Sequence, residues 1–300
     1  MKSILYKLSY WKYTRDRYHY LREKLHLLEE KVDLGGHSIH YFHSKTGNRD
    51  LVCLHGLLDA AFGFRRILPH LNQDWKVHLV DIPGFGKSKL PPIKYLYQLD
   101  HFVEFIYESI QKKDLRDVFL LGHSMGGLLA QHLSLLDARR DGRIKALILL
   151  SPGSQPHPER DEMRKLLFPT TEEEVIHLLR SLYSHNLPDP SPFLKKTLVH
   201  AWNSKEYGFL AENTIARESE IFFGKRAAGI QIPTLILSGE KDEITSLKSV
   251  QNLSQWIKNS VLITIPEAKH AIHLEFPEFI AEKINAFPME WKVSKRKKKK

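Results

Sequence analysis

The sequence has very little cysteine and no long apolar run. Its single cysteine, Cys53, excludes an intrachain disulfide, and the apolar run 51–54 around it favours a small buried side chain over a reactive thiol. No run approaches the roughly 20 apolar residues that span a bilayer. The N-terminus lacks the apolar segment and the cleavage site of a secretory signal. These absences predict a cytoplasmic protein in a reducing compartment, either free or peripheral to a membrane.

Positive charge is concentrated at the two ends of the chain. The formal net charge is +10, of which residues 1–24 carry +5 and residues 295–300 carry +6, so the remaining residues carry −1. Because the basic residues are not interleaved with a recognition fold, we expect no specific nucleic-acid partner. Residues 289–300 end in a run of basic side chains that repel one another, which predicts a basic disordered tail.

Short apolar runs alternate with helical patterns from about residue 31 onward. Runs rich in β-formers and without polar alternation are typical of strands buried on both faces, as parallel sheets require. The alternation therefore predicts an α/β fold with a mostly parallel central sheet flanked by helices. The expected strands are 37–42, 51–54, 77–80, 118–121, 146–150, 234–237 and 261–265, and the expected helices are 100–112, 128–139, 247–257 and 278–287.

The alternation stops between residues 153 and 231. This stretch has no convincing strand, and it has helical patterns at 172–183 and 193–202 that are separated by proline-rich breaks. We interpret it as an inserted helical cap on a core made of residues 31–152 and 232–288. A set of ordinary surface helices is the alternative.

A Gly-x-Ser-x-Gly pattern surrounds Ser124, between the expected strand 118–121 and a helical stretch. A serine on a sharp strand-to-helix turn is exposed above the sheet, and the glycines on both sides, Gly122 and Gly126, avoid clashes. The helix that follows directs its free N–H groups toward a developing oxyanion. The pattern alone also fits a small-residue turn, but the strand before it and the helix after it indicate a catalytic nucleophile.

A second donor for an oxyanion hole is expected after the strand 51–54. His55 and Gly56 follow that strand directly. A glycine at this point lets the backbone approach the nucleophile, so that the N–H of Leu57 can join that of Met125 in binding the oxyanion. The simpler alternative is that His55 and Gly56 only turn the chain.

A carboxylate and a histidine follow the last two expected strands. Asp242 comes after 234–237 and His270 comes after 261–265, so both are expected at the sheet edge where Ser124 lies. A histidine takes a serine proton near neutral pH, and a buried carboxylate fixes the tautomer of that histidine. The three residues therefore predict a nucleophile, a supporting acid and a base.

Residues of the same types compete for the last two roles. Glu240 and Glu243 flank Asp242, and His273 follows His270 by three residues. We prefer His270 because it leaves the strand directly, whereas His273 belongs to the next turn.

The chain resembles the α/β-hydrolase superfamily from about residue 32 to residue 287. The resemblance rests on several motifs in one order, which are His55-Gly56, Asp81-Ile82-Pro83-Gly84-Phe85-Gly86-Lys87-Ser88, the segment 122–127, Gly239-Glu240-Lys241-Asp242, and His270 followed by Glu275-Phe276-Pro277-Glu278. It implies that 81–88 is a structural turn and that 153–231 is the variable cap. The order serine, acid, histidine is that of this fold. Lys269 stands where the family usually has a glycine.

The resemblance and the three residues together predict a serine hydrolase that cleaves a carboxylic ester of a fairly apolar small-molecule or lipid substrate, through an acyl-enzyme on Ser124. Epoxide hydrolases and haloalkane dehalogenases of this fold use aspartate as the nucleophile. Because Ser124 occupies that position here, we do not expect either of those activities. Carbon–carbon bond hydrolases of ring-cleavage pathways share the triad, but they commonly carry asparagine where this chain has His123, which favours an ester. A non-catalytic, hydrolase-like binding protein is the alternative from another class.

No metal or organic cofactor is expected, because acyl transfer by a serine triad needs neither. The histidines His37, His40 and His43 lie in a strand-like segment without carboxylate or cysteine ligands beside them, so they do not predict a metal site.

Residues 1–30 show the pattern of a basic amphipathic helix. Apolar residues recur at steps of three, four or seven, and basic residues and tyrosines lie between them. This pattern predicts either binding to an anionic membrane surface, through residues 1–24 and 295–300, or packing on the hydrolase body or another subunit. The apolar positions are Ile4, Leu8, Trp11, Tyr18, Leu21, Leu25 and Leu28.

Overall fold

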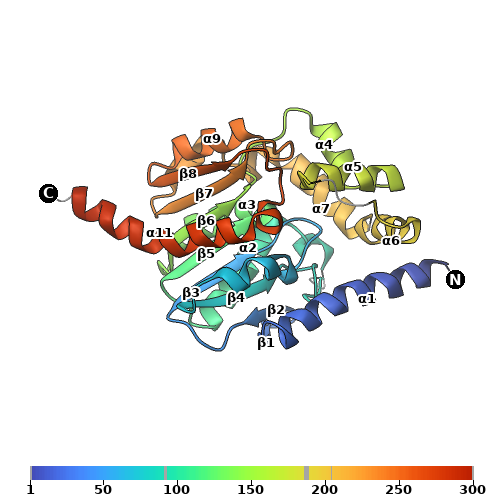
Figure 1. Cartoon of the computed structure of the whole chain (residues 1–300), viewed down its shortest axis with the longest axis horizontal. Coiled ribbons are helices and arrows are strands. Elements are labelled where there is room, and N and C mark those ends of the chain that lie inside the picture. Colours follow the sequence, from blue (N-terminus) through green and yellow to red (C-terminus); the bar gives the residue numbers. More distant parts are fainter. Residues whose placement is uncertain (1, 91–92, 186–188, 204, 299–300) are drawn as a thin grey trace.

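The computed structural model describes residues 2–90, 93–185, 189–203 and 205–298, without the side chains of residues 2, 3, 94, 205 and 289–298. An eight-stranded sheet forms its centre, in the order β1-β2-β4-β3-β5-β6-β7-β8, with helices on both faces (Figure 1). The pairs β1–β2 and β2–β4 are antiparallel, whereas all neighbours from β4 to β8 are parallel. The predicted fold class is therefore confirmed.

The strands include all seven predicted ones and one that was missed. Their bounds are β1 Leu28–Asp33, β2 Ser38–His43, β3 Arg49–Leu54, β4 Trp75–Asp81, β5 Val118–His123, β6 Ile144–Leu150, β7 Thr234–Gly239 and β8 Ser260–Ile265. β1 was missed because it is an edge strand whose side chains are mostly charged and exposed, so it carries no apolar run. The sheet consequently begins at Leu28 rather than at residue 31.

The helices that pack on the sheet are α1 Lys2–Glu23, α2 Leu99–Lys112, α3 Met125–Asp137, α9 Leu247–Trp256, α10 Ile272–Glu275 and α11 Pro277–Lys298. The described elements between β6 and β7 are all helical: α4 Arg160–Leu167, α5 Glu172–Leu182, α6 Pro192–Trp202, α7 Lys205–Ala216, α8 Glu218–Ile221 and η4 Gly224–Gly229. Three further 3-10 helices are η1 Ala61–Arg66, η2 Leu68–His70 and η3 Lys94–Leu96.

Two hydrophobic layers hold the helices against the sheet. Buried side chains of α2, α3 and α9, such as Phe102, Leu129 and Leu253, pack on one face. On the other face, α1, η1 and α11 pack through residues such as Leu21 and Ile284. Cys53 is buried in this second layer, and burial raises the pKa of its thiol, as expected of a structural cysteine.

The C-terminal tail differs from the prediction. Residues 289–298 continue α11, where we expected disorder. The helix α11 is anchored by buried residues in its first turns, and Lys and Arg have high helix propensity, which allows the backbone to continue as a helix beyond the body. Residues 299–300 and the side chains of 289–298 lie outside what the structure describes, so the expected membrane contact of 295–300 does too.

The N-terminal helix is shorter than the apolar pattern predicted, and its apolar residues do not share one environment. It ends at Glu23, and Leu28 begins β1 instead. Tyr18 and Leu21 are buried against the body, whereas Ile4 and Trp11 are exposed. α1 also packs along α6 of the insertion, with which it lies at one end of the molecule, while α11 extends toward the opposite end (Figure 1). No described helix is long and apolar enough to cross a membrane.

A buried hydrogen bond ties α1 to the turn 81–88. The Tyr18 hydroxyl donates to Oδ2 of Asp81 at 2.8 Å. The same carboxylate accepts the N–H of Ala61 at 2.7 Å and the N–H of Lys87 at 3.0 Å. Burial raises the pKa of Asp81 to about 6 in spite of these donors. This turn is therefore a structural junction that joins α1, η1 and the end of β4.

We expect Tyr18→Phe to lower the free energy of unfolding by about 1–3 kcal/mol, because a buried carboxylate loses a donor that water cannot replace. Urea denaturation of both proteins measures the difference. The matched control is Tyr20→Phe on the exposed side of the same helix, which should change stability by less than about 0.5 kcal/mol. Equal losses in the two variants would show that the Tyr18 hydroxyl makes no special contribution.

Candidate active site

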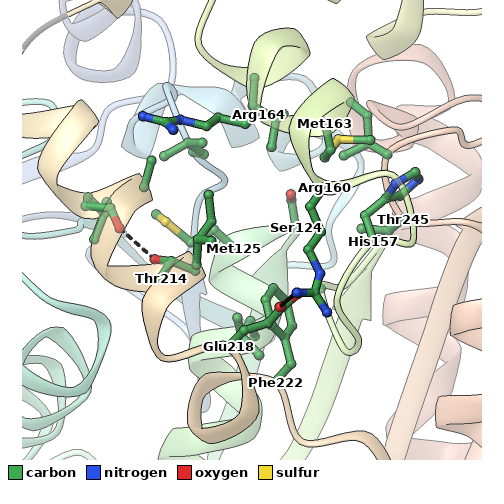
Figure 2. A pocket seen from close by; sticks show the side chains of 18 of the residues that line it. Ser124, Met125, His157, Arg160, Met163, Arg164, Thr214, Glu218, Phe222 and Thr245 are labelled. Carbon is green, nitrogen blue, oxygen red and sulfur yellow. Dashed lines mark hydrogen bonds and ion pairs between the residues drawn. The ribbon is translucent and has the colours of Figure 1, made fainter.

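Ser124 lies on the sharp turn between β5 and α3, in the strained backbone conformation that the sequence predicted. Its φ is 52° and its ψ is −115°, which are rare values for a residue with a side chain. The turn is held from both sides, because the Ser124 N–H donates to the carbonyl of Leu150 at 3.0 Å and the Ser124 carbonyl accepts the N–H of Gly153 at 3.1 Å. In Figure 2 the Ser124 hydroxyl points into a cavity.

Two glycines let the loop after β3 reach this turn. A Cβ on Gly126 would lie 2.1 Å from the carbonyl oxygen of Leu54, and a Cβ on Gly56 would lie 3.3 Å from the Cβ of Ser124. The backbone at Gly56 therefore passes beside the nucleophile candidate. No described hydrogen bond uses the N–H of Leu57 or that of Met125. Both amides are available as donors at this point.

His55 fixes the shape of the loop that carries Leu57. Its Nε2 accepts the N–H of Ile82 at 3.1 Å, so its Nδ1 carries the proton and donates to the carbonyl of Gly56 at 2.8 Å. The ring is fully buried, and burial lowers the pKa of His55 to about 4. Neutral His55 thus links the loop after β3 to the end of β4 through hydrogen bonds. This role goes beyond the simple turn considered from the sequence.

Asp242 and His270 meet at the carboxyl ends of β7 and β8. His270 Nδ1 donates to Asp242 Oδ2 at 2.9 Å, and both residues are buried. Asp242 also accepts the N–H of Ile244 and the N–H and hydroxyl of Thr245, at 2.8–2.9 Å. Burial alone would raise the pKa of Asp242, but His270 and Thr245 hold it below its ordinary value. The carboxylate stays ionised, and since Nδ1 of His270 donates to it, Nε2 is the ring atom of His270 that can accept a proton.

Neither His273 nor Glu240 takes part in the bonded pair of Asp242 and His270. No described bond joins His273 to Asp242; both ring nitrogens of His273 lack a described partner, and burial lowers its pKa to about 3. Glu240 instead accepts the Thr264 hydroxyl at the surface. His123 is buried between the two histidines, with ring centroids 4.9 Å from His270 and 4.2 Å from His273. Burial, followed by the charges of these neighbours, holds the pKa of His123 well below its usual range.

A first cavity of about 200 Å³ opens beside Ser124 and has mostly apolar walls (Figure 2). The core contributes Leu57 and Met125, and the insertion contributes side chains from α4, α7 and α8. At its rim, Arg160 at the start of α4 pairs with Glu218 at the start of α8 at 2.9 Å. The apolar lining residues are Leu57, Leu99, Met125, Leu128, Met163, Leu167, Phe168, Leu210, Ala211, Ile215, Phe222 and Ile244.

A second cavity of about 170 Å³ shares Ser124 with the first and is also lined by His270. It is more polar, because α1 contributes Tyr10, Tyr13 and Arg17 to its walls. The sequence pattern did not predict a contribution of α1 to this site. The sequence does carry a signal for this contribution, because a tyrosine or arginine recurs at every third or fourth position of the N-terminal helix. That recurrence does not by itself identify which part of the protein the helix contacts.

The insertion is bonded to the loop that carries His270. Lys269 Nζ donates to the carbonyl of Arg180, at the end of α5, at 2.7 Å. The N–H of Ala271 donates to the carbonyl of Leu182 at 2.8 Å. Lys269 therefore has a structural role at the position where the family usually has a glycine, since it binds the C-terminal end of α5.

The part of the chain from residue 51 to residue 178 matches the family model described as alpha/beta hydrolase fold. Hydrolase YugF of Bacillus subtilis is 25% identical over 276 residues, which are 84% of this chain and 94% of the relative. The 2-hydroxy-6-oxo-6-(2'-aminophenyl)hexa-2,4-dienoic acid hydrolase of Metapseudomonas resinovorans is 21% identical over 264 residues, which are 85% of this chain and 89% of the relative.

The solved structures show the same fold. The crystal structure of a membrane phospholipase A superposes with a TM-score of 0.76 at 21% identity, and the match covers 97% of this chain and 99% of that chain. The family match and the curated relatives support the α/β-hydrolase superfamily for this chain, and the solved structures show its fold. The chain is a hydrolase of that fold, as the motifs predicted.

The neutral state of His55 gives stability a pH dependence. Its pKa is about 4 in the folded protein and about 6.5 when exposed, so the unfolded chain binds more protons between these values and stability falls as pH falls. We expect the stability advantage of the wild type over His55→Gln to shrink by about 1–2 kcal/mol from pH 7 to pH 5. Urea denaturation at both pH values measures this change, and a constant difference would contradict a buried neutral His55.

Proposed function

We propose that this protein is a serine hydrolase that cleaves a carboxylic ester with a fairly apolar acyl group. The observation that carries the proposal is the bond of 2.9 Å between buried Asp242 and His270, beside a cavity that His270 and Ser124 both line. An ionised carboxylate that fixes a neutral histidine beside a strained serine is the arrangement that activates a hydroxyl group. In this proposal Ser124 is the nucleophile, His270 is the base and Asp242 is the supporting acid.

The reaction has two halves. Ser124 Oγ attacks the ester carbonyl carbon and gives its proton to His270, while the N–H groups of Leu57 and Met125 bind the oxyanion. The carbon–oxygen bond then breaks, and His270 returns the proton to the leaving alcohol. Water attacks the acyl-enzyme, His270 takes its proton, and that proton goes back to Ser124 as the carboxylic acid leaves.

The helical insertion acts in this proposal as a cap over Ser124. Met163 and Leu167 of α4 and Leu210 of α7 form walls of the first cavity, so a substrate in it would be enclosed between core and insertion. An apolar cavity of this kind binds an acyl chain by removing it from water, at roughly 0.8 kcal/mol for each buried CH₂ group. Arg160 and Glu218, which also line this cavity, are joined by an ion pair.

Labelling with a fluorophosphonate probe tests the proposal. We expect rapid labelling of the wild type, none of Ser124→Ala, and a loss of ester hydrolysis on the order of 10³-fold or more in His270→Ala. The exposed residue His19 supplies a matched control, since His19→Ala should retain both activities. The variant His273→Ala tests the competing histidine. If His273→Ala is not labelled while His270→Ala remains active, then His273 and not His270 is the base.

The same preparation separates the alternatives. A folded wild type that the probe does not label would favour the non-catalytic binding protein. Labelling without hydrolysis of any ester, together with cleavage of a vinylogous 1,5-diketone, would favour a carbon–carbon bond hydrolase like the Metapseudomonas relative.

We further propose that the outer face of α1 binds an anionic lipid surface. Ile4, Leu5, Leu8 and Trp11 are 52–62% exposed, although one face of the helix packs on the body. The exposed basic residues Lys7, Lys12 and Arg15 accompany them. Apolar side chains with adjacent positive charge are what an interfacial helix needs. Packing on the body and membrane binding, the two alternatives from the sequence, then involve different residues of one helix.

Vesicle co-sedimentation tests this surface. The wild type should bind vesicles that contain phosphatidylglycerol more strongly than vesicles of phosphatidylcholine alone, and Trp11→Glu should lose most of this binding because it places a charge among the exposed apolar residues. Val261→Glu is the control, since Val261 is similarly exposed on β8 at the far edge of the sheet from β1. Equal binding of the wild type and Trp11→Glu would contradict the proposal.

A further inference from the structure

The second cavity holds two arginine side chains without a carboxylate partner. Arg17 Nη1 donates to the carbonyl of Tyr13 at 3.0 Å, and Arg65 Nη1 donates to the carbonyl of Phe62 at 3.2 Å. Within the ranges that the structure describes, no ion pair joins either guanidinium to an acidic side chain. Each guanidinium has five N–H donors, so most of the donors of both remain available.

The cavity carries a net positive charge. Asp59 is the one acidic side chain among the described residues that line it, so two guanidinium groups face one carboxylate. Burial raises the pKa of Asp59 to about 6, and the charges of Arg65 and Arg17 offset part of that increase. Burial lowers the pKa of Arg17, and the nearby charge of Arg65 lowers it further. An anion in the cavity would relieve this repulsion.

The two cavities differ in whether the proposed base, His270, lines them. His270 lines the second cavity and is not among the residues that line the first. In ester cleavage, the histidine must reach the oxygen of the leaving alcohol in order to protonate it. The leaving alcohol therefore belongs on the side of the second cavity, and the acyl chain belongs in the apolar first cavity.

From these observations we propose that the second cavity binds the alcohol portion of the ester, and that Arg17 and Arg65 recognise a phosphate group on that alcohol. The inference rests on the proposed function, because it assigns the two sides of the substrate relative to Ser124. Two guanidinium groups from separate elements, α1 and η1, match the several oxygens of a phosphate better than a single neutral hydroxyl. The substrate class is an acyl ester of a phosphorylated alcohol.

The position of Arg17 is well defined by its surroundings. Its guanidinium carbon lies 3.3 Å from the centroid of the Tyr13 ring, and the neighbouring Tyr18 is bonded to Asp81. A stacked guanidinium loses less conformational freedom when it binds an anion. Arg17 also lies before the segment 51–178 that matches the family model, so this specificity would come from the N-terminal helix α1.

Two esters with the same acyl chain test the inference: 1-octanoylglycerol and 1-octanoylglycerol 3-phosphate. The measured quantity is the ratio of kcat/KM for the phosphate ester to kcat/KM for the neutral ester. Arg17→Met and Arg65→Met should each lower this ratio at least about ten-fold, since each removes a charged hydrogen-bond donor. Asp59→Asn should raise it, because it removes the opposing negative charge. Arg116→Met, at an exposed arginine paired with Asp114, should leave the ratio unchanged.

The outcomes separate the inference from the proposed function. Equal losses on both esters in the two arginine variants, or an unchanged ratio, would overturn the phosphate subsite, while fluorophosphonate labelling of the wild type would still support the serine hydrolase. A wild type that is neither labelled nor active on either ester would overturn both. Arg17→Lys, which keeps the charge, should restore part of the ratio if the side chain binds the phosphate and is not only needed for folding.

Discussion

The left-handed backbone of Ser124 depends on contacts from three neighbouring segments. Its N–H is bonded to Leu150 on β6, its carbonyl is bonded to Gly153, and Gly126 lies against the carbonyl of Leu54 at the end of β3. Such a conformation costs on the order of 1–3 kcal/mol, so it persists only where the surroundings enforce it. The parallel arrangement of β3, β5 and β6 supplies that enforcement, and the same arrangement brings the ends of β7 and β8 to this edge.

Two segments that are distant in sequence enclose this edge of the sheet. The insertion between β6 and β7 contributes apolar walls to the first cavity, and α1 contributes aromatic and basic side chains to the second. They also pack on each other, through α1 and α6 (Figure 1). Because the insertion is bonded to the His270 loop through Lys269 and Ala271, a movement of the insertion would also move the loop that carries the proposed base.

Much of the fold was predictable, because strands buried on both faces leave continuous apolar runs that can be recognised without a structure. The order of the motifs around Ser124, Asp242 and His270 likewise placed three residues at one sheet edge, since parallel strands end on the same side. The errors have local causes. β1 is a charged edge strand without an apolar run, and the segment 289–298 continues a helix whose first turns are anchored by the core.

The sequence by itself determined the sheet, the strained serine turn and the pool of residues from which a triad could be drawn. Only the tertiary structure decided that His270 rather than His273 meets Asp242, that Thr245 and His55 support the site, and that Arg17 faces a cavity beside Ser124. The physical reason is that periodicity reports which side of an element is buried, but not which distant element covers it. Those partners are set by packing in three dimensions.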